Sequence, residues 1–272
     1  MQDWLLYLLM KKHFLLSITA GIAMSAGALH AQIIPISLTG NTQYDGWADF
    51  GTITGSYGSN PGTVAWNSGA IGSNTGSSGD AAITKGSNGT AGGPYKGGGS
   101  IYFGGFSATP NTNGGSVIFS DTSVVGSLKT LVFQLDIGEA FGHDFFNDNT
   151  DIQLTLQTNG APVVLSADYF TLLGRVDTGE VFDPGTGPEP IYRNTYGWQW
   201  DFTSLYATDG FAITGYSLTV NAVQHAQIYA AQLDQGDTFA QVVPEPSTYA
   251  LMALGLGLIV WKNRRRLVKS AS

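Results

Sequence analysis

The stretch "KTLVFQLDI", residues 129–137, has the alternation of a β-strand. Its large apolar side chains fall on one side of an extended chain, and they are Leu131, Phe133, Leu135 and Ile137. Gln134 and Asp136 fall on the other side. A period of two residues is typical of a strand with one buried face and one face in water.

Similar patterns recur along the chain from Ser100 onward. "DIQLTLQT" (151–158) alternates throughout, and Asn159-Gly160 after it is a hairpin signal. Further candidates are "SIYFGGF" (100–106), "GGSVIFS" (114–120), "YGWQWDF" (196–202), "FAITGYSLTV" (211–220) and "HAQIYAAQLD" (225–234). About ten to twelve short strands separated by turn clusters predict an all-β fold, a β-sandwich of jelly-roll type.

Two regions are rich in turn-forming residues. Residues 32–99 contain much Gly, Ser, Asn and Thr, which favours loops joining short strands. Recurring aromatic residues such as Trp47, Phe50 and Trp66 should pin this region to the core. Residues 177–195 are expected to form a long Gly/Pro loop.

The N-terminus has the features of an export signal over residues 1–31. Lys11 and Lys12 precede an apolar run, and small residues follow it. We expect a signal peptidase to cut after Ala31, with Ala28 as the second choice, and the true start to be Met10. An uncleaved membrane helix is the alternative.

The charge of the central region, residues 32–243, excludes some partners. It holds 18 acidic and five basic residues, a net charge of −13. This charge disfavours nucleic acid, because phosphate would be repelled. The chain has no cysteine, so disulfides and thiolate metal sites are excluded.

Two groups of side chains could bind a ligand. Trp198 and Trp200 share one strand face, where they could either stack on sugar rings or fill the core. A second group offers oxygen ligands suited to calcium, or else Asx turns capping a strand, and consists of Asp144, Asp148, Asn149 and Asp151. No motif of a nucleophilic, zinc-dependent or nucleotide-dependent enzyme occurs, so we expect no enzymatic activity and no cofactor other than calcium.

The C-terminal stretch "VVPEPSTYALMALGLGLIVWKNRRRLVKSAS", residues 242–272, has three parts. Pro244-Glu245-Pro246 comes first, an uncharged run over 249–261 follows, and the basic cluster ends the tail with Arg264, Arg265 and Arg266. As a transmembrane helix the run would be about 20 Å long, shorter than the ~30 Å hydrocarbon layer. The basic cluster would keep the C-terminus cytoplasmic.

These three parts, in this order, resemble the PEP-CTERM sorting signal over about residues 243–266. The resemblance implies that Pro244, Glu245 and Pro246 are read by an exosortase, a membrane transpeptidase-like protease. Residues 249–261 would be a transient inner-membrane helix, and Arg264–Arg266 the stop-transfer signal. Proteins with such tails are exported by bacteria that make extracellular polysaccharide.

We therefore expect an exported β-sandwich domain over 32–241, followed by the sorting tail over 242–272. Its destination would be the cell envelope, the surface or the extracellular matrix. Its role would be structural or adhesive and linked to exopolysaccharide or biofilm. A lectin-like carbohydrate-binding module is the alternative, and a glycan-active enzyme is a more distant one.

Overall fold

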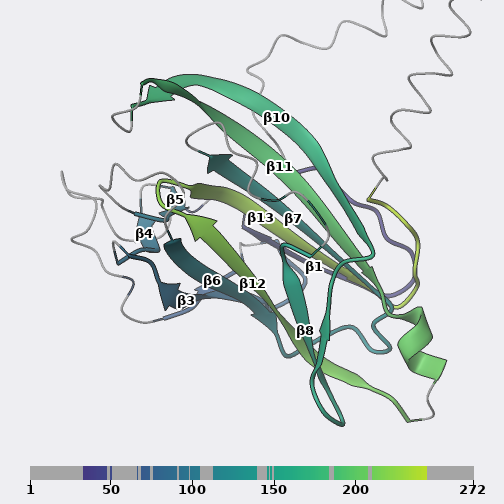
Figure 1. The fold of residues 1–272 in the computed structure, drawn as a ribbon. Helices are drawn as coiled ribbons and strands as arrows, with labels where there is room; N and C mark the ends of the chain where they lie inside the picture. Colours follow the sequence, from purple (N-terminus) through teal and green to yellow (C-terminus); the bar gives the residue numbers. More distant parts are fainter. Residues whose placement is uncertain are drawn as a thin grey trace, which may run out of the picture. The chain divides into compact units, whose positions relative to one another are not determined.

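The structure, a computed structural model, describes residues 33–47, 50, 66, 69–73, 76–90, 92–97, 99–104, 113–139, 146, 148, 150–183, 187–207 and 210–243. In these ranges the regular structure is β-strand, apart from one 3-10 helix, η2 (Thr203–Ala207). The strands form two antiparallel sheets that lie as facing layers (Figure 1). This arrangement is consistent with the predicted β-sandwich, whereas the jelly-roll subtype stays a prediction.

The seven-stranded sheet has the order β10-β11-β7-β13-β5-β4, and β1 also pairs with β13. Its strands are β1 (Thr42–Trp47), β4 (Tyr95–Gly97), β5 (Ser100–Tyr102), β7 (Thr130–Glu139), β10 (Tyr169–Phe182), β11 (Glu189–Asp201) and β13 (Gln227–Gly236). The six-stranded sheet has the order β2-β3-β6-β12-β8-β9. Its strands are β2 (Ile71–Gly72), β3 (Ala82–Asn88), β6 (Asn113–Asp121), β8 (Gln153–Thr158), β9 (Val163–Leu165) and β12 (Ile213–Val223).

The core lies between the sheets and is rich in aromatic rings. Phe133 of β7 meets Phe119 of β6 edge-on, with ring centroids 4.9 Å apart, and stacks on Trp198 of β11 at 5.7 Å. Trp47 and Phe50 from the Gly-rich region are also buried there. The predicted inward face of 129–137 is therefore confirmed, as is the anchoring of the Gly-rich region.

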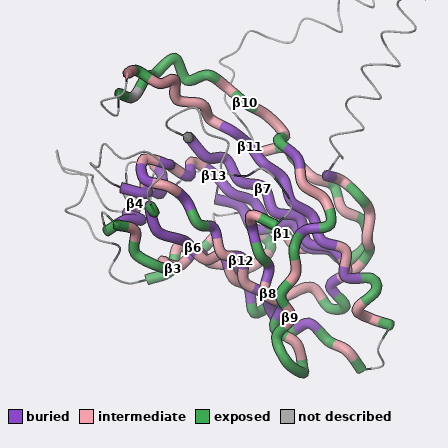
Figure 2. Tube along the Cα trace, viewed as in Figure 1, coloured by how far each residue is buried: buried purple, intermediate pink, exposed green. Residues whose placement is uncertain are grey.

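The other face of β7 differs from the expectation. Gln134 and Asp136 are 0% and 1% exposed, although alternation placed them in water. Figure 2 shows β7 as buried along its length. The reason is that residues outside β7, Ile34 and Arg193 among them, lie against this face and bind both side chains.

The expected loop over 177–195 is largely a hairpin instead. β10 continues to Phe182, and β11 begins at Glu189, with Val181 paired to Pro190. Pro190 is tolerated because it sits at the start of its strand, where a ladder donor is dispensable. Register shifts interrupt the β10–β11 pairing, and its exposed tip is visible in Figure 2. Such bulges protect an edge strand from pairing with other chains.

Candidate functional site

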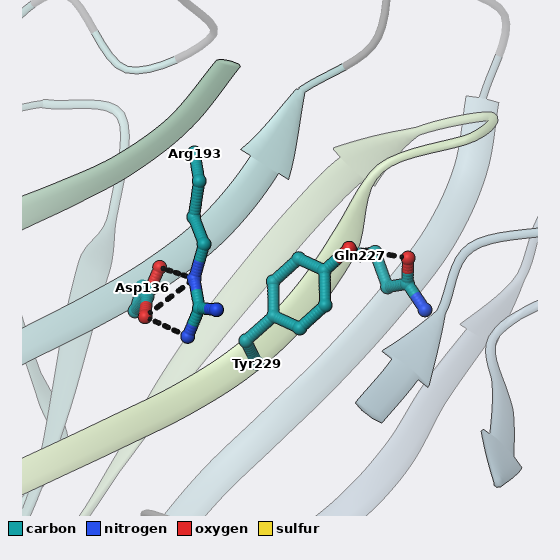
Figure 3. A network of polar contacts seen from close by, with 4 residues as sticks. All are labelled: Asp136, Arg193, Gln227 and Tyr229. Atoms are coloured by element: carbon teal, nitrogen blue, oxygen red, sulfur yellow. Dashed lines mark hydrogen bonds and ion pairs between the residues drawn. The ribbon is translucent and has the colours of Figure 1, made fainter. Parts of the chain in front are cut away.

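A charged pair lies on the outer face of the seven-stranded sheet, the side turned away from the core. Arg193 of β11 donates from Nε to Asp136 Oδ1 and Oδ2 of β7 at 2.8 and 2.9 Å, and Nη2 also contacts Oδ2 (Figure 3). Asp136 is buried, so without this guanidinium its charge would be costly. The pair therefore neutralises a carboxylate inside the protein.

The pair continues into a chain of contacts on β13. The guanidinium carbon of Arg193 lies 4.3 Å from the ring centroid of Tyr229, a cation–π distance. Tyr229 packs over Gly138, where a Cβ atom would come within 2.8 Å of its ring. The Tyr229 hydroxyl donates to Gln227 Oε1 at 2.8 Å (Figure 3). These groups bind one another, which makes them a structural network rather than an open site.

The segment after the predicted signal peptide is held on the same face. Gln134 accepts the backbone N–H of Ile34 at 2.9 Å and donates to the Ile34 carbonyl at 2.7 Å. These two bonds imitate a strand pairing. Leu38 lies next to Gly236, where an added Cβ atom would be 3.3 Å from its side chain.

The segment at the other end is held by Gln199 of β11. Its Nε2 donates to the Ala240 carbonyl at 2.7 Å, and its Oε1 accepts the backbone N–H groups of Val242 and Val243 at 2.9 and 3.0 Å. Val243 is 1% exposed. The described part of the fold therefore reaches Val243, and the predicted domain boundary after residue 241 stays a prediction.

Among the described residues, the outer face of the six-stranded sheet carries no comparable network of charged and amide side chains. Residues at adjacent register positions on its strands point away from the core and form two rows, in which polar side chains alternate with the apolar Ala82, Ile118 and Val164. The polar members carry hydroxyl or amide groups. They include Thr84, Ser120, Gln153, Thr155, Ser217 and Thr219. No side chain in this set hydrogen-bonds to another described residue. The strands of this sheet hold two charged residues, Lys85, which donates to the Gly92 carbonyl, and Asp121, which is buried.

An open polar pocket of about 440 Å³ lies beside β1. Its lining comprises Thr42, Gln43, Ser78, Gly79, Asp80, Ser123 and Val125. Nearby carboxyl groups of Asp45 and Asp121 are buried, and burial raises the pKa of each. Within the described ranges, no three acidic or histidine side chains are grouped to hold a metal ion.

Trp198 and Trp200 are both 0% exposed. Phe146 packs edge-on against Trp198, with ring centroids 5.3 Å apart. A buried indole cannot offer its face to a sugar ring. The sugar-stacking alternative is therefore wrong for these two residues, since their strand turns them towards the other sheet.

The predicted calcium loop is described only at Asp148 and Asp151, and its other members, Asp144 and Asn149, lie outside the described residues. Asp148 Oδ1 accepts the N–H and hydroxyl of Thr150 at 2.7 and 2.6 Å, an Asx turn. These bonds lower the pKa of Asp148. Asp151 Oδ2 accepts the Asp148 N–H at 3.0 Å, so both carboxylates shape the turn and calcium binding stays a prediction.

The two residues that hold the end segments on the outer face of the seven-stranded sheet were not predicted as functional residues from the sequence. Gln199 stands between two tryptophans in "GWQWD", and Gln134 stands in an apolar strand. An uncharged amide flanked by core residues on a central strand is the signal that could have found both. The partners of both glutamines lie far away in the sequence, so a local pattern could not predict which residues they bind.

The predicted cleavage site at Ala31, Pro244-Glu245-Pro246, the helix over 249–261 and Arg264–Arg266 lie outside the described residues. Among the residues that are described, no helix is long and apolar enough to cross a membrane.

Comparison with known proteins identified one feature of the chain, its C-terminal sorting motif. No curated protein and no solved structure matches the chain. A family model, the PEP-CTERM protein-sorting motif, matches residues 242–266. The matched segment begins at one of the two valines that Gln199 holds, and the tail of this chain carries a PEP-CTERM protein-sorting motif.

Proposed function

We propose that this chain is an exported surface or extracellular-matrix protein with a structural or adhesive role towards an uncharged exopolysaccharide. The PEP-CTERM motif indicates exosortase-dependent export to the cell surface. A signal peptidase and an exosortase would act during export, from an inner-membrane precursor. The adhesive role draws its support from the outer face of the six-stranded sheet.

That face suits a hydroxyl-rich, neutral polymer. Six of its outward side chains are hydroxyls or an amide whose hydrogen-bonding groups are not used by other described residues, and the apolar Ala82, Ile118 and Val164 lie in the same rows. It has no outward basic group on its strands to attract an anionic polymer, and the surrounding domain carries a net charge of −13. Its described strand residues also include no outward aromatic side chain of the kind typical of protein interfaces. Many weak polar contacts along a polymer would give adhesion through multivalency.

Binding of the exported protein to immobilised dextran, a neutral glucan, and to alginate, an anionic glycan, tests this role. We expect retention on dextran and little on alginate. The double variant Thr155→Glu/Ser217→Glu should reduce retention on dextran about tenfold, because its charges must be desolvated. Val181→Asp, at an exposed position of β10, is the matched control and should bind normally. Equal binding by parent and double variant would refute the assignment of this face.

The sorting route has its own test. Glu245→Ala should leave the precursor unprocessed, because the exosortase would lose the central carboxylate of the motif. Unchanged processing and release of this variant would contradict sorting through the motif, whatever the glycan result.

A lectin-like module is the second candidate, and the pocket beside β1 favours it. Hydroxyl groups, an amide and the Asp80 carboxylate converge there, as in many small-ligand sites. Asp80→Asn should then abolish binding of a mono- or disaccharide, while Thr155→Glu/Ser217→Glu should not. Loss of binding in EDTA would implicate calcium. We expect no hydrolysis of the host polysaccharide.

A further inference from the structure

The last described segment, residues 239–243, is attached to the sheet at several points. Phe239 stacks on Tyr169 of β10 with ring centroids 6.1 Å apart. Gln199 then binds the Ala240 carbonyl and the Val242 and Val243 N–H groups. Figure 1 shows this yellow segment turning back after β13. The attachment therefore extends to the residue before Pro244.

Gln199 is itself fixed in place. Its side chain is fully buried, and its Nε2 also donates to Thr130 Oγ1 of β7 at 3.1 Å. Beside it, Gly197 lies close to Leu173 and Val243: an added Cβ atom would come within 2.9 Å of Leu173 Cδ1 and would be in ordinary contact, at 3.6 Å, with Val243 Cγ2. The fixed amide of Gln199 is therefore the group that holds the end of the described domain.

We propose that Gln199 is a positioning residue for sorting. It keeps residues 240–243 hydrogen-bonded to β11, so that the sorting protease cuts the chain on the C-terminal side of Val243. This inference rests on the proposed sorting route. A peptide bond in a hydrogen-bonded, buried segment is cut only after local unfolding. The peptide bonds between residues 239 and 243 are therefore protected from cleavage as long as this segment stays bound to the sheet.

In the cleavage step, one peptide C–N bond after Val243 breaks. The acyl carbon gains an oxygen from water or a nitrogen from an acceptor amine, and the leaving nitrogen takes a proton. The mature domain then keeps residues 239–243 as part of its fold.

The first measurement is amide hydrogen exchange on the full-length precursor in mild detergent. The Val242 and Val243 amides should exchange at least about tenfold faster in Gln199→Leu than in the parent, the effect of losing one hydrogen bond's free energy. Gln134→Leu is the matched control, since it frees Ile34 at the other end and should leave both amides protected. Val242→Pro removes one donor without touching the sheet, and it should expose Val243 even if Gln199→Leu fails to fold.

The second measurement is the intact mass of the protein released by the native host. The parent and Gln134→Leu should end at or after Val243, and Gln199→Leu should add shorter forms. A released parent protein that ends before Val243 would overturn the inference. So would a Val243 amide that exchanges at the same rate in the parent, in Gln199→Leu and in Val242→Pro. If the host does not process the parent protein, both the sorting proposal and the proposed cleavage position are wrong. Amide hydrogen exchange in the unprocessed precursor still tests whether Gln199 holds Val242 and Val243.

Discussion

The two outer faces of this protein are built on the same strand geometry and are used differently. On the seven-stranded sheet, Asp136 is paired with Arg193, and Gln134 and Gln199 bind the two end segments of the domain. On the six-stranded sheet, six outward polar side chains have no hydrogen-bonding partner among the described residues, and they are Thr84, Ser120, Gln153, Thr155, Ser217 and Thr219. The first face is covered by other parts of its own chain, whereas the polar groups of the second that the described residues leave unbonded are the basis of the proposed adhesive role.

The contrast has a physical origin in how polar groups are covered. A buried amide or carboxylate is tolerated only when its hydrogen bonds are replaced, so covering the first face required matched partners for each group. Ser and Thr in contact with water need none. The covered face should therefore be sensitive to substitution, and the open one should not.

Removing one partner of the Asp136–Arg193 ion pair should lower the free energy of unfolding more than any other change on the covered face. Arg193→Met leaves Asp136 buried without its counterion, which should cost about 3–5 kcal/mol of unfolding free energy. Urea unfolding of the full chain in mild detergent measures it. The double variant Asp136→Leu/Arg193→Met should regain at least half, because neither charge is then stranded. A loss below about 1 kcal/mol would mean that water already reaches Asp136.

A second test uses pH at Asp234, on the same face of β13. Burial raises its pKa to about 7, while a hydrogen bond from Gln232 and the charge of Asp45 have smaller, opposing effects. The folded chain thus binds a proton that the unfolded chain releases near pH 3.9, so this group's contribution falls as pH rises from about 4 to 7. Between pH 5 and 8 the loss should be about 2–3 kcal/mol. Asp234→Asn should remove this slope in urea unfolding at both pH values, and an unchanged slope would refute a raised pKa.

The N-terminal attachment gives a smaller effect. Gln134→Leu removes two hydrogen bonds to Ile34, at a cost of about 1–2 kcal/mol, because the freed backbone groups can turn to water. Limited proteolysis of the full chain should then cut near Ile34 sooner than in the parent. Gln153→Leu, a matched change on the open face, should leave the cleavage pattern as it was. Equal cutting in both variants would contradict the attachment.

The sequence predicted the inward faces because alternation depends on neighbours two residues apart. Phe133 and Leu135 are examples, and the burial of Trp47 followed from its size and setting. The outward environment of Gln134 depends on Ile34, a hundred positions away, and no local pattern carries that information. For the same reason, the sequence could not decide whether Trp198 and Trp200 fill the core or bind sugar, because their burial depends on the opposite sheet.

The functional residues also differ in whether local sequence could predict them. The sorting motif was recognisable because its three parts are contiguous, and the family model matches the tail. Gln199 was not, because its function depends on a turn that brings residues 240–243 back to β11. The loop over 177–195 was misjudged because Gly and Pro tolerate turns, yet a long antiparallel neighbour can still order them as strands.

The smallest expected effect is on the open face. Ser217→Ala and Thr219→Val delete hydroxyls that bind no described side chain, so each should change the unfolding free energy by less than about 0.5 kcal/mol. Thr219 lies between Ile118 and Gln153 in its row, and valine keeps both its shape and its preference for strands. A loss above about 1 kcal/mol would show that these hydroxyls are already engaged, and the contrast between the faces would disappear. Unchanged stability together with weaker retention on dextran would instead assign the hydroxyls to a partner, because a group that adds nothing to folding but is needed for binding has its hydrogen bonds outside the chain.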